Sequence, residues 1–222
     1  MRTLYHYPLC AFSRAIRLYL NEKELAYAAI IENPWDRKHI FSKNHTISDI
    51  PTLEEKAGLV LEGWYPIVEQ LEQLYRSPPL FGKSFKEKAE IRKITALFNE
   101  MFFADVTKLI VFEKIFKKHI ENRSPDSTFI RRGCSNINTY FEYITWAADH
   151  RNWLAGDDFS IADIAAAAHI SCIDYLGSIN WENYPSVKDW YVRIKSRPTF
   201  REILNDRISE CQPPAHYSDL DF

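Results

Sequence analysis

The sequence predicts two kinds of structure in one chain, an α/β unit followed by an all-α unit. Residues 1 to about 76 alternate between strand-like and helix-like stretches. The segment Ser77-Pro78-Pro79-Leu80-Phe81-Gly82 is then rich in residues that break regular structure. After it, apolar residues recur only at helical spacing. We therefore divide the chain into an α/β unit at 1–76, a linker at 77–86, a helical unit at 87–206 and an extended tail at 207–222.

The α/β unit follows the order strand, helix, strand, strand, strand, helix. We expect strands at Thr3–Tyr7, Ala26–Ile31, Thr52–Glu55 and Val60–Glu62, and helices at Phe12–Asn21 and Pro66–Tyr75. The tripeptide Lys56-Ala57-Gly58 provides the tight turn between the last two strands. This order is typical of a thioredoxin-like unit.

Cys10 lies at the predicted turn between the first strand and the first helix. The unpaired amides of a helix start and its positive dipole end face such a position, and Arg14 adds a cation one turn later. Both effects lower the pKa of a thiol and favour the reactive thiolate. The sequence therefore predicts a nucleophilic cysteine, with a small residue at a structural turn as an equal alternative.

The helical unit begins with one long amphipathic helix, straight or kinked, from Lys86 to about Ile120. Its aromatic stripe favours core packing over a substrate wall. A second helix is expected from about Asp126 to His150. Ser160-Ile161-Ala162-Asp163 is a capping box, and the helix after it, Ile161–Leu176, is apolar on nearly all sides. We expect this last helix to be the buried centre of the unit.

Composition excludes several classes of protein. The 222 residues carry a formal charge of −2, so there is no bulk attraction to nucleic acid or to an anionic membrane. No apolar run approaches the ~20 residues of a membrane-spanning helix, and Met1-Arg2-Thr3 leads directly into a strand rather than a signal peptide. The four cysteines are scattered without a C-x-x-C pair, which argues against disulfides and against a metal site. We expect a cytoplasmic protein.

The turn at Cys10 and three further motifs resemble the glutathione S-transferase (GST) superfamily over roughly residues 1–206. The motifs are Ile50-Pro51-Thr52-Leu53, GDDFSIADIAAAA and YPSVKDWYVRIKSRPTF. The resemblance implies a thioredoxin-like N-terminal domain, a helical-bundle C-terminal domain and a homodimer. It also implies that Cys10 occupies the nucleophile position and that Pro51 is a cis proline beside which the Ile50 backbone holds glutathione. Asp163 corresponds to the capping aspartate, whose role is in folding.

One part of the glutathione site departs from the family pattern. The family expects an acidic residue followed by serine at the start of the last helix of the first domain, whereas this chain has Glu62-Gly63-Trp64-Tyr65-Pro66. Glu62 would meet the γ-glutamyl amine, but the missing serine removes a hydrogen bond worth ~1.5–3 kcal/mol, or about ten- to a hundredfold in affinity. Pro66 should also start the helix late. We expect weak glutathione binding and no other cofactor.

Two features point to a particular kind of GST-like protein. The loop at 32–38 places Trp35 among charges, and the tail Cys211–Phe222 contains Pro213-Pro214 and an aromatic, acidic end. Together with RNWLAGD and AAAAHIS, they resemble the bacterial GST-like cell-division proteins of the FtsZ-localised A type. That resemblance implies a dimeric, non-catalytic scaffold that binds FtsZ, alters its filaments and works at the division site.

On this hypothesis the tail from Pro213 to Phe222 contacts FtsZ. Tyr217, Leu220 and Phe222 would make apolar contacts with FtsZ. The charges of Asp219 and Asp221 would set the electrostatic register of the contact. Trp35 would belong to the same surface or to a second one. Tail removal should then leave thermal stability nearly unchanged. The alternatives are a tail packed along its own domain and a loop with one packed tryptophan.

Two other functions remain open at the level of sequence. One is a transferase that conjugates glutathione to small electrophiles, or performs thiol transfer, through Cys10, Ile50, Pro51 and Glu62. The other is a GST-fold protein with a different ligand.

Overall fold

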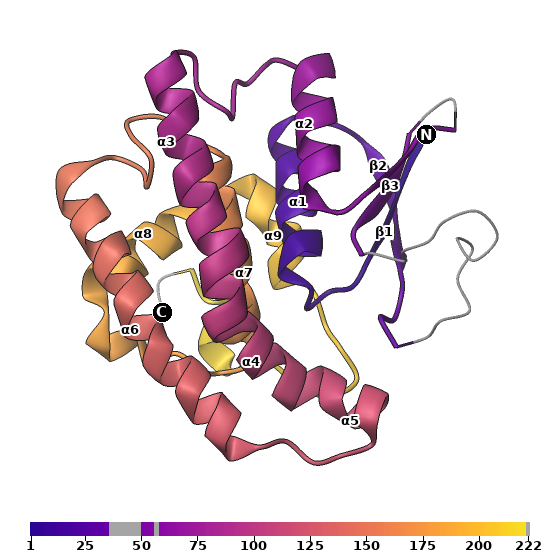
Figure 1. The fold of residues 1–222 in the computed structure, drawn as a ribbon, viewed down its shortest axis with the longest axis vertical. Coiled ribbons are helices and arrows are strands. Elements are labelled where there is room, and N and C mark those ends of the chain that lie inside the picture. Colours follow the sequence, from indigo (N-terminus) through magenta and orange to yellow (C-terminus); the bar gives the residue numbers. More distant parts are fainter. Residues whose placement is uncertain (36–49, 56–57, 221–222) are drawn as a thin grey trace.

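The fold is described from a computed structural model (Figure 1), which describes residues 1–35, 50–55 and 58–220. The expected turn at Lys56-Ala57 and the loop residues 36–38 lie outside the described residues. None of the helices in these three ranges combines the length and the apolar character needed to cross a membrane. No group of three or more His, Cys, Asp or Glu side chains in the same ranges is placed to hold a metal ion.

The N-terminal domain is built on a four-stranded sheet in the order β2-β1-β3-β4. The strands are β1 (Arg2–His6), β2 (Tyr27–Ile31), β3 (Thr52–Glu54) and β4 (Val60–Glu62). β1 pairs in parallel with β2 and antiparallel with β3, which pairs antiparallel with β4. Helix α1 (Ala11–Glu22) connects the two parallel strands and packs against the second domain. This is the predicted thioredoxin-like arrangement.

Helix α2 (Trp64–Leu74) starts two residues earlier than predicted. Pro66 is its third residue, a position whose N–H has no partner inside a helix, so proline costs no hydrogen bond there. Gly63 makes the entry with φ of +80°, and its N–H donates to the Pro51 carbonyl at 2.9 Å. The expectation that Pro66 delays the helix was therefore wrong.

The long helix of the second domain is continuous and contains two π-helical stretches. It comprises α3 (Phe85–Ala96), the π-helical η2 (Leu97–Thr107), α4 (Lys108–Val111), the π-helical η3 (Phe112–Phe116) and α5 (Lys117–Glu121). A capping box of Ser84 and Glu87 opens α3. π-Helical winding widens the turn and is concentrated at functional sites in proteins.

The centre of the second domain is α7 (Ile161–Tyr175), every residue of which is buried. α7 packs against α1 of the first domain and against α3 and η2 of the long helix, and Figure 1 shows it in the middle of the molecule. The predicted capping box at Ser160 and Asp163 is confirmed. α6 (Ser127–His150) crosses the long helix closely because Gly133 has no side chain, and a Cβ there would lie 2.8 Å from Ile110.

The chain ends in α8 (Pro185–Lys195), α9 (Arg201–Leu204) and a C-terminal segment, described for residues 205–220. Pro214 is extended, as predicted, and a short 3-10 turn follows at Ala215–Ser218. Lys195 holds this segment, because its Nζ donates to the carbonyls of His216 at 3.3 Å and Asp219 at 2.7 Å. The segment is therefore packed along its own domain.

Candidate functional site

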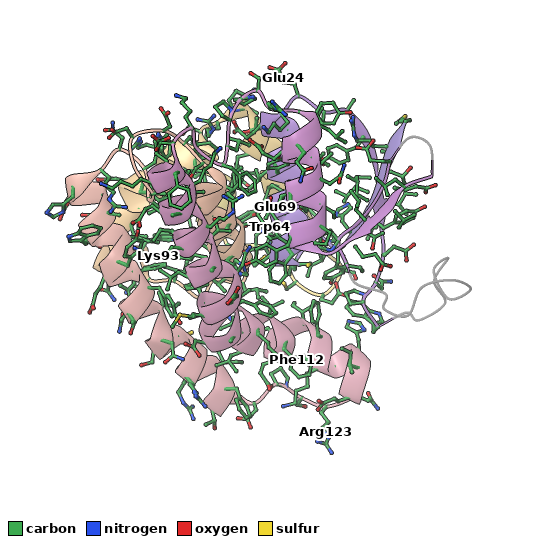
Figure 2. All side chains as sticks on the ribbon, turned by 45° about the horizontal axis from the view of Figure 1, so that its top comes forward. Glu24, Trp64, Glu69, Lys93, Phe112 and Arg123 are labelled. Atoms are coloured by element: carbon green, nitrogen blue, oxygen red, sulfur yellow. The ribbon has the colours of Figure 1, made fainter. Side chains whose placement is uncertain are left out.

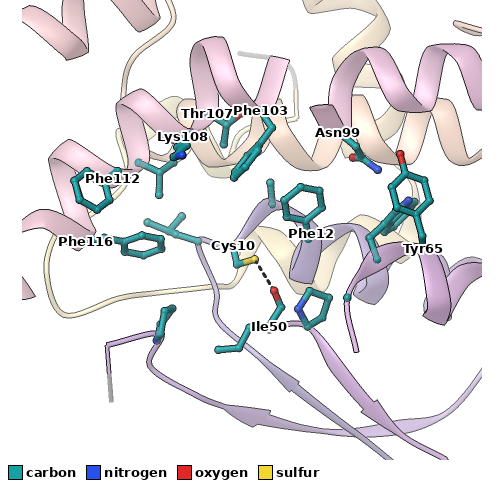
Figure 3. A pocket seen from close by; sticks show the side chains of 17 residues that line it. Cys10, Phe12, Ile50, Tyr65, Asn99, Phe103, Thr107, Lys108, Phe112 and Phe116 are labelled. Atoms are coloured by element: carbon teal, nitrogen blue, oxygen red, sulfur yellow. Dashed lines mark hydrogen bonds between the residues drawn. The ribbon is translucent and has the colours of Figure 1, made fainter. Parts of the chain in front are cut away.

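A pocket of about 550 Å³ lies between the two domains. Its walls come from the residues before and at the start of α1, the Ile50-Pro51 pair, the start of α2, and the long helix from η2 to η3. Figure 3 shows Cys10 and Phe12 facing this helix, with Phe112 and Phe116 toward one end of the pocket and Asn99 and Tyr65 toward the other. Aromatic and aliphatic side chains dominate the lining.

Cys10 lies in this pocket, but its thiol is not activated. The residue is the N-cap of α1, and its Sγ lies 3.6 Å from the Ile50 carbonyl oxygen. Burial raises the pKa of the Cys10 thiol, and this outweighs the hydrogen bonds from Ser13 and Phe12 and the charge of Arg14, which lower it. The prediction of a lowered pKa was wrong because it omitted the cost of desolvating a thiolate.

The Arg14 guanidinium makes its hydrogen bonds and its ion pair with groups other than Cys10. Its guanidinium is fully buried, donates to the Pro8 carbonyl at 2.6 Å and to Ser171 Oγ at 2.9 Å, and lies 3.6 Å from the Asp206 carboxylate. The rings of Tyr175 and Tyr217 lie 5.6 and 5.9 Å from it. Its charge therefore ties α1 to the second domain instead of activating the thiol.

The predicted glutathione-site residues are brought together only in part. The Ile50-Pro51 peptide bond is cis, as predicted, and both residues line the pocket beside Cys10. Glu62 ends β4 half-buried and is not among the described residues that line the pocket. The chain has no serine in the segment Glu62–Pro66, and Trp64 in this segment is buried and lies near the middle of the molecule in the view of Figure 2. No side chain caps the start of α2 in the described part of the chain.

A chain of buried polar residues that reaches the wall of the pocket was not predicted from the sequence. His169 on α7 contacts Thr107 Oγ1 through Nδ1 at 3.0 Å and Asn99 Oδ1 through Nε2 at 3.2 Å. Burial lowers the pKa of His169 to about 3, so the ring is neutral at physiological pH. The only sequence signal was the pair Asn99 and Thr107, two polar residues eight positions apart on an apolar helix face.

Trp35 is a packed tryptophan. Its ring stacks on His119 with centroids 4.0 Å apart and an angle of 6° between the planes, and it lies 5.4 Å from Tyr7 and 5.9 Å from Phe116. His119 in turn lies 3.1 Å from the Glu210 carboxylate. Trp35 thus joins the loop after β2 to α5, and the ring remains half-buried.

The C-terminal segment differs from the prediction at Tyr217. Its side chain is 0% exposed, packs 5.1 Å from the Tyr175 ring and donates its hydroxyl proton to the Ile203 carbonyl at 3.3 Å. An apolar contact of Tyr217 with a partner is therefore wrong for this fold, and from this burial we now expect that removing the tail lowers stability. Leu220 is half-buried, whereas Asp221 and Phe222 lie outside the described residues.

Two family models match the chain. The model for the glutathione S-transferase N-terminal domain matches residues 4–79, and the model for the glutathione S-transferase C-terminal domain matches residues 107–207. Among curated proteins, FtsZ-localized protein A of Caulobacter vibrioides is 38% identical over 224 residues, with 100% of this chain and 98% of that protein covered.

Solved structures resemble the chain over its full length. A glutathione S-transferase from Rhodospirillum rubrum F11 has a TM-score of 0.96 at 44% identity, with 100% of both chains covered. The structure of FzlA from C. crescentus has a TM-score of 0.95 at 38% identity, with 100% of this chain and 99% of that chain covered.

Proposed function

The chain belongs to the glutathione S-transferase family, and on this premise we propose that it is a non-catalytic cell-division protein that binds FtsZ and changes the organisation of its filaments. The observation that carries the proposal is the extent of the match to FtsZ-localized protein A. That match covers the whole chain, including residues 208–222, which lie beyond the end of the C-terminal family model. The work would be done in the cytoplasm at the division site.

The chemistry of the pocket supports a non-catalytic role. A transferase of this family stabilises a thiolate, which requires donors or positive charge directed at sulfur. Here burial raises the pKa of Cys10, and Arg14 is committed to Asp206 and Ser171. The segment Glu62–Pro66 contains no serine that could hold the γ-glutamyl group. Each departure weakens glutathione chemistry.

The contact with FtsZ is proposed for the chain end after Tyr217. The Tyr217 ring and the Lys195 bonds fix the course of the segment up to Asp219. Asp219, Leu220, Asp221 and Phe222 would then supply the acidic and apolar contacts. The half-buried ring of Trp35 is proposed as a second contact.

The test is co-sedimentation with FtsZ filaments of the chain lacking Leu220–Phe222. This deletion keeps Tyr217 and both carbonyl acceptors of Lys195, so we expect an unchanged fold and at least tenfold weaker binding. A Trp146→Ala variant is the matched control, because it removes an exposed aromatic side chain from α6. Undiminished co-sedimentation of the truncated chain would refute the assignment of the contact to these residues.

We also propose a homodimer. The Tyr65 hydroxyl donates to Glu100 at 3.1 Å, so α2 and η2 are adjacent, and both expose apolar side chains, with Tyr65 46% and Met101 56% exposed. Such neighbouring apolar groups favour association. Sedimentation velocity should give a mass near twice 26.1 kDa, and Met101→Asp should shift it toward the monomer. A monomer at micromolar concentration would contradict the proposal.

A glutathione transferase is the second candidate, favoured by one observation. Cys10 and the cis Ile50-Pro51 pair line the same pocket, as the transferase hypothesis requires. Calorimetric titration with reduced glutathione at neutral pH separates the candidates. We expect no detectable binding, whereas a dissociation constant in the micromolar to low-millimolar range would favour the transferase.

A further inference from the structure

Another pocket, of about 430 Å³, lies where the long helix, the end of α7 and the C-terminal segment meet. Lys114 of η3 and Cys211 of the C-terminal segment both line it, and both residues are half-buried. Ile115, Leu176 and Pro214 supply apolar parts of the wall. An amine and a thiol, which are both nucleophilic groups, therefore share one pocket that is separate from the interdomain site.

The Lys114 amine is held by neutral groups. Its Nζ donates to the Leu176 carbonyl at 2.9 Å and to Ser178 Oγ at 2.9 Å, and no carboxylate of the described residues pairs with it. Lys117, three residues later, instead pairs with the Glu113 carboxylate at 2.8 Å. Burial lowers the pKa of the Lys114 amine, because the ammonium loses water without gaining an opposite charge. The neutral amine, which is the nucleophilic form, is therefore more accessible here than at an ordinary lysine.

The Cys211 thiol faces the same pocket from a fixed backbone. The Cys211 carbonyl accepts a hydrogen bond from the Tyr175 hydroxyl at 3.1 Å, and the thiol forms no disulfide. Burial and the Glu210 charge raise the pKa of Cys211, whereas the Lys114 charge lowers it. The Cys211 charge in turn raises the pKa of Lys114, so the two groups lie close enough to act on each other. Cys134 acts on Lys114 in the same way, but it is not among the described residues that line this pocket.

We propose that Cys211 and Lys114 form an acyl-transfer site, in which a small acyl group passes from an acyl thioester to the Cys211 thiol and then to the Lys114 amine. The volume and the apolar walls suit a short acyl chain. The product is a neutral amide, so the transfer removes a half-buried positive charge that no carboxylate of the described residues balances. The site uses none of the residues proposed to contact FtsZ, and its test needs no FtsZ.

The transfer proceeds in two steps, neither of which needs an oxidant or a reductant. In the first, the Cys211 sulfur attacks the acyl carbon, the C–S bond of the donor breaks, and the released donor thiolate takes up the proton that Cys211 loses. In the second, the neutral Lys114 amine attacks the acyl carbon on Cys211. A C–N bond forms, the C–S bond breaks, and a proton from the amine passes to the Cys211 sulfur, which regenerates the thiol.

Incubation of the full chain with the acetyl thioester of N-acetylcysteamine tests the proposal. Peptide mass spectrometry follows acetylation of each lysine with time at a pH of about 8, where part of a lysine with a lowered pKa is neutral. Lys114 should be acetylated about tenfold faster than Lys117, because the acyl group is delivered from within the pocket. Lys117 in the same sample is the internal reference for direct acetylation.

Three variants separate the roles of the thiol and the amine. Cys211→Ala should slow acetylation of Lys114 about tenfold, because the amine must then attack the free thioester. Lys114→Arg keeps the positive charge and removes the acceptor, so the acetyl group should accumulate on Cys211 as a thioester that hydroxylamine cleaves. Cys134→Ala is the matched control and should change the rate at Lys114 less than about twofold.

A second reagent reports whether the Lys114 amine is still reachable in Cys211→Ala. N-hydroxysuccinimidyl acetate acetylates amines directly, and its rate at Lys114 should equal that of the wild-type chain. Equal thioester rates at Lys114 in the wild type and Cys211→Ala would overturn the proposal, as would a rate at Lys114 no higher than that at Lys117. An equal decrease with both reagents would overturn it too, since the thiol would then act only by packing.

Discussion

Replacing Tyr217 by alanine tests whether the C-terminal segment is part of the folded core. The ring is 0% exposed and lies edge-on to Tyr175 at 5.1 Å, and its hydroxyl donates to the Ile203 carbonyl. The Arg14 guanidinium lies 5.9 Å from the ring centroid. The substitution therefore opens a cavity at the point where α1, α7 and the C-terminal segment meet.

The expected cost follows from these contacts. Truncating a buried aromatic residue to alanine destabilises a protein by about 3–5 kcal/mol. For a chain of this length, each kcal/mol lowers the melting temperature by roughly 2–4 °C, so we expect a decrease on the order of 10 °C. Tyr217→Phe removes only the hydroxyl and should cost about 1 kcal/mol.

Urea unfolding followed by circular dichroism measures both variants. Leu220→Ala is the control, because Leu220 is half-buried in the same segment and should cost less than Tyr217→Ala. A loss of less than about 1 kcal/mol in Tyr217→Ala would refute the reasoning, since such a value is typical of surface substitutions rather than of a core residue. The C-terminal segment would then be detached in solution.

Three further predictions concern buried ionisable groups. Burial, with a smaller effect of the Arg17 charge, lowers the pKa of His6 to about 4, and burial lowers that of His169 to about 3. Below pH 6.5 the unfolded chain therefore takes up protons that the folded chain does not, and stability should fall by about 2 kcal/mol per histidine between pH 6.5 and 5, as urea unfolding at each pH would measure. Asp206→Asn leaves the Arg14 charge buried without its carboxylate and should cost about 3–5 kcal/mol by the same assay. Because burial raises the pKa of Cys10, its alkylation by iodoacetamide at pH 7, followed by mass spectrometry, should be slower than that of free cysteine.

Each of these has a control or a contradicting outcome. His169→Gln should remove about half of the acid sensitivity, and an unchanged pH slope would show that the ring is already charged in the folded state. Asp158→Asn breaks an exposed pair with Lys83 and should cost less than 1 kcal/mol. Cys10→Ala identifies the alkylated peptide, and modification of Cys10 faster than free cysteine would contradict its raised pKa.

The sequence placed the helices and strands because their signals are local. The apolar run of Ile161–Tyr175 and its capping box lie within a few residues of one another, and so predicted a buried, capped helix. The turn at Cys10 followed from a strand, a proline and a helical pattern in succession. The start of α2 was misplaced by two residues, because Gly63 and the Pro51 carbonyl, just before the neighbouring strand β3, set its entry.

The functional groups of the site depended on distant contacts. The pKa of the Cys10 thiol is raised by the protein that surrounds it. The Arg14 guanidinium pairs with Asp206, which lies nearly two hundred residues away in the sequence. Asn99 and Thr107 are connected only because α7 places His169 between them. None of these contacts has a local signature.

The sequence by itself therefore determined the order of the helices and strands and the Cys10 turn, since these signals lie in neighbouring residues, whereas the cis Ile50-Pro51 bond was implied by the family resemblance. The tertiary structure alone decided that Tyr217 belongs to the core, that the pKa of the Cys10 thiol is raised, and that Asn99 contacts His169 on α7. Burial and electrostatic environment are sums over all neighbours in space, and the fold is what brings those neighbours together.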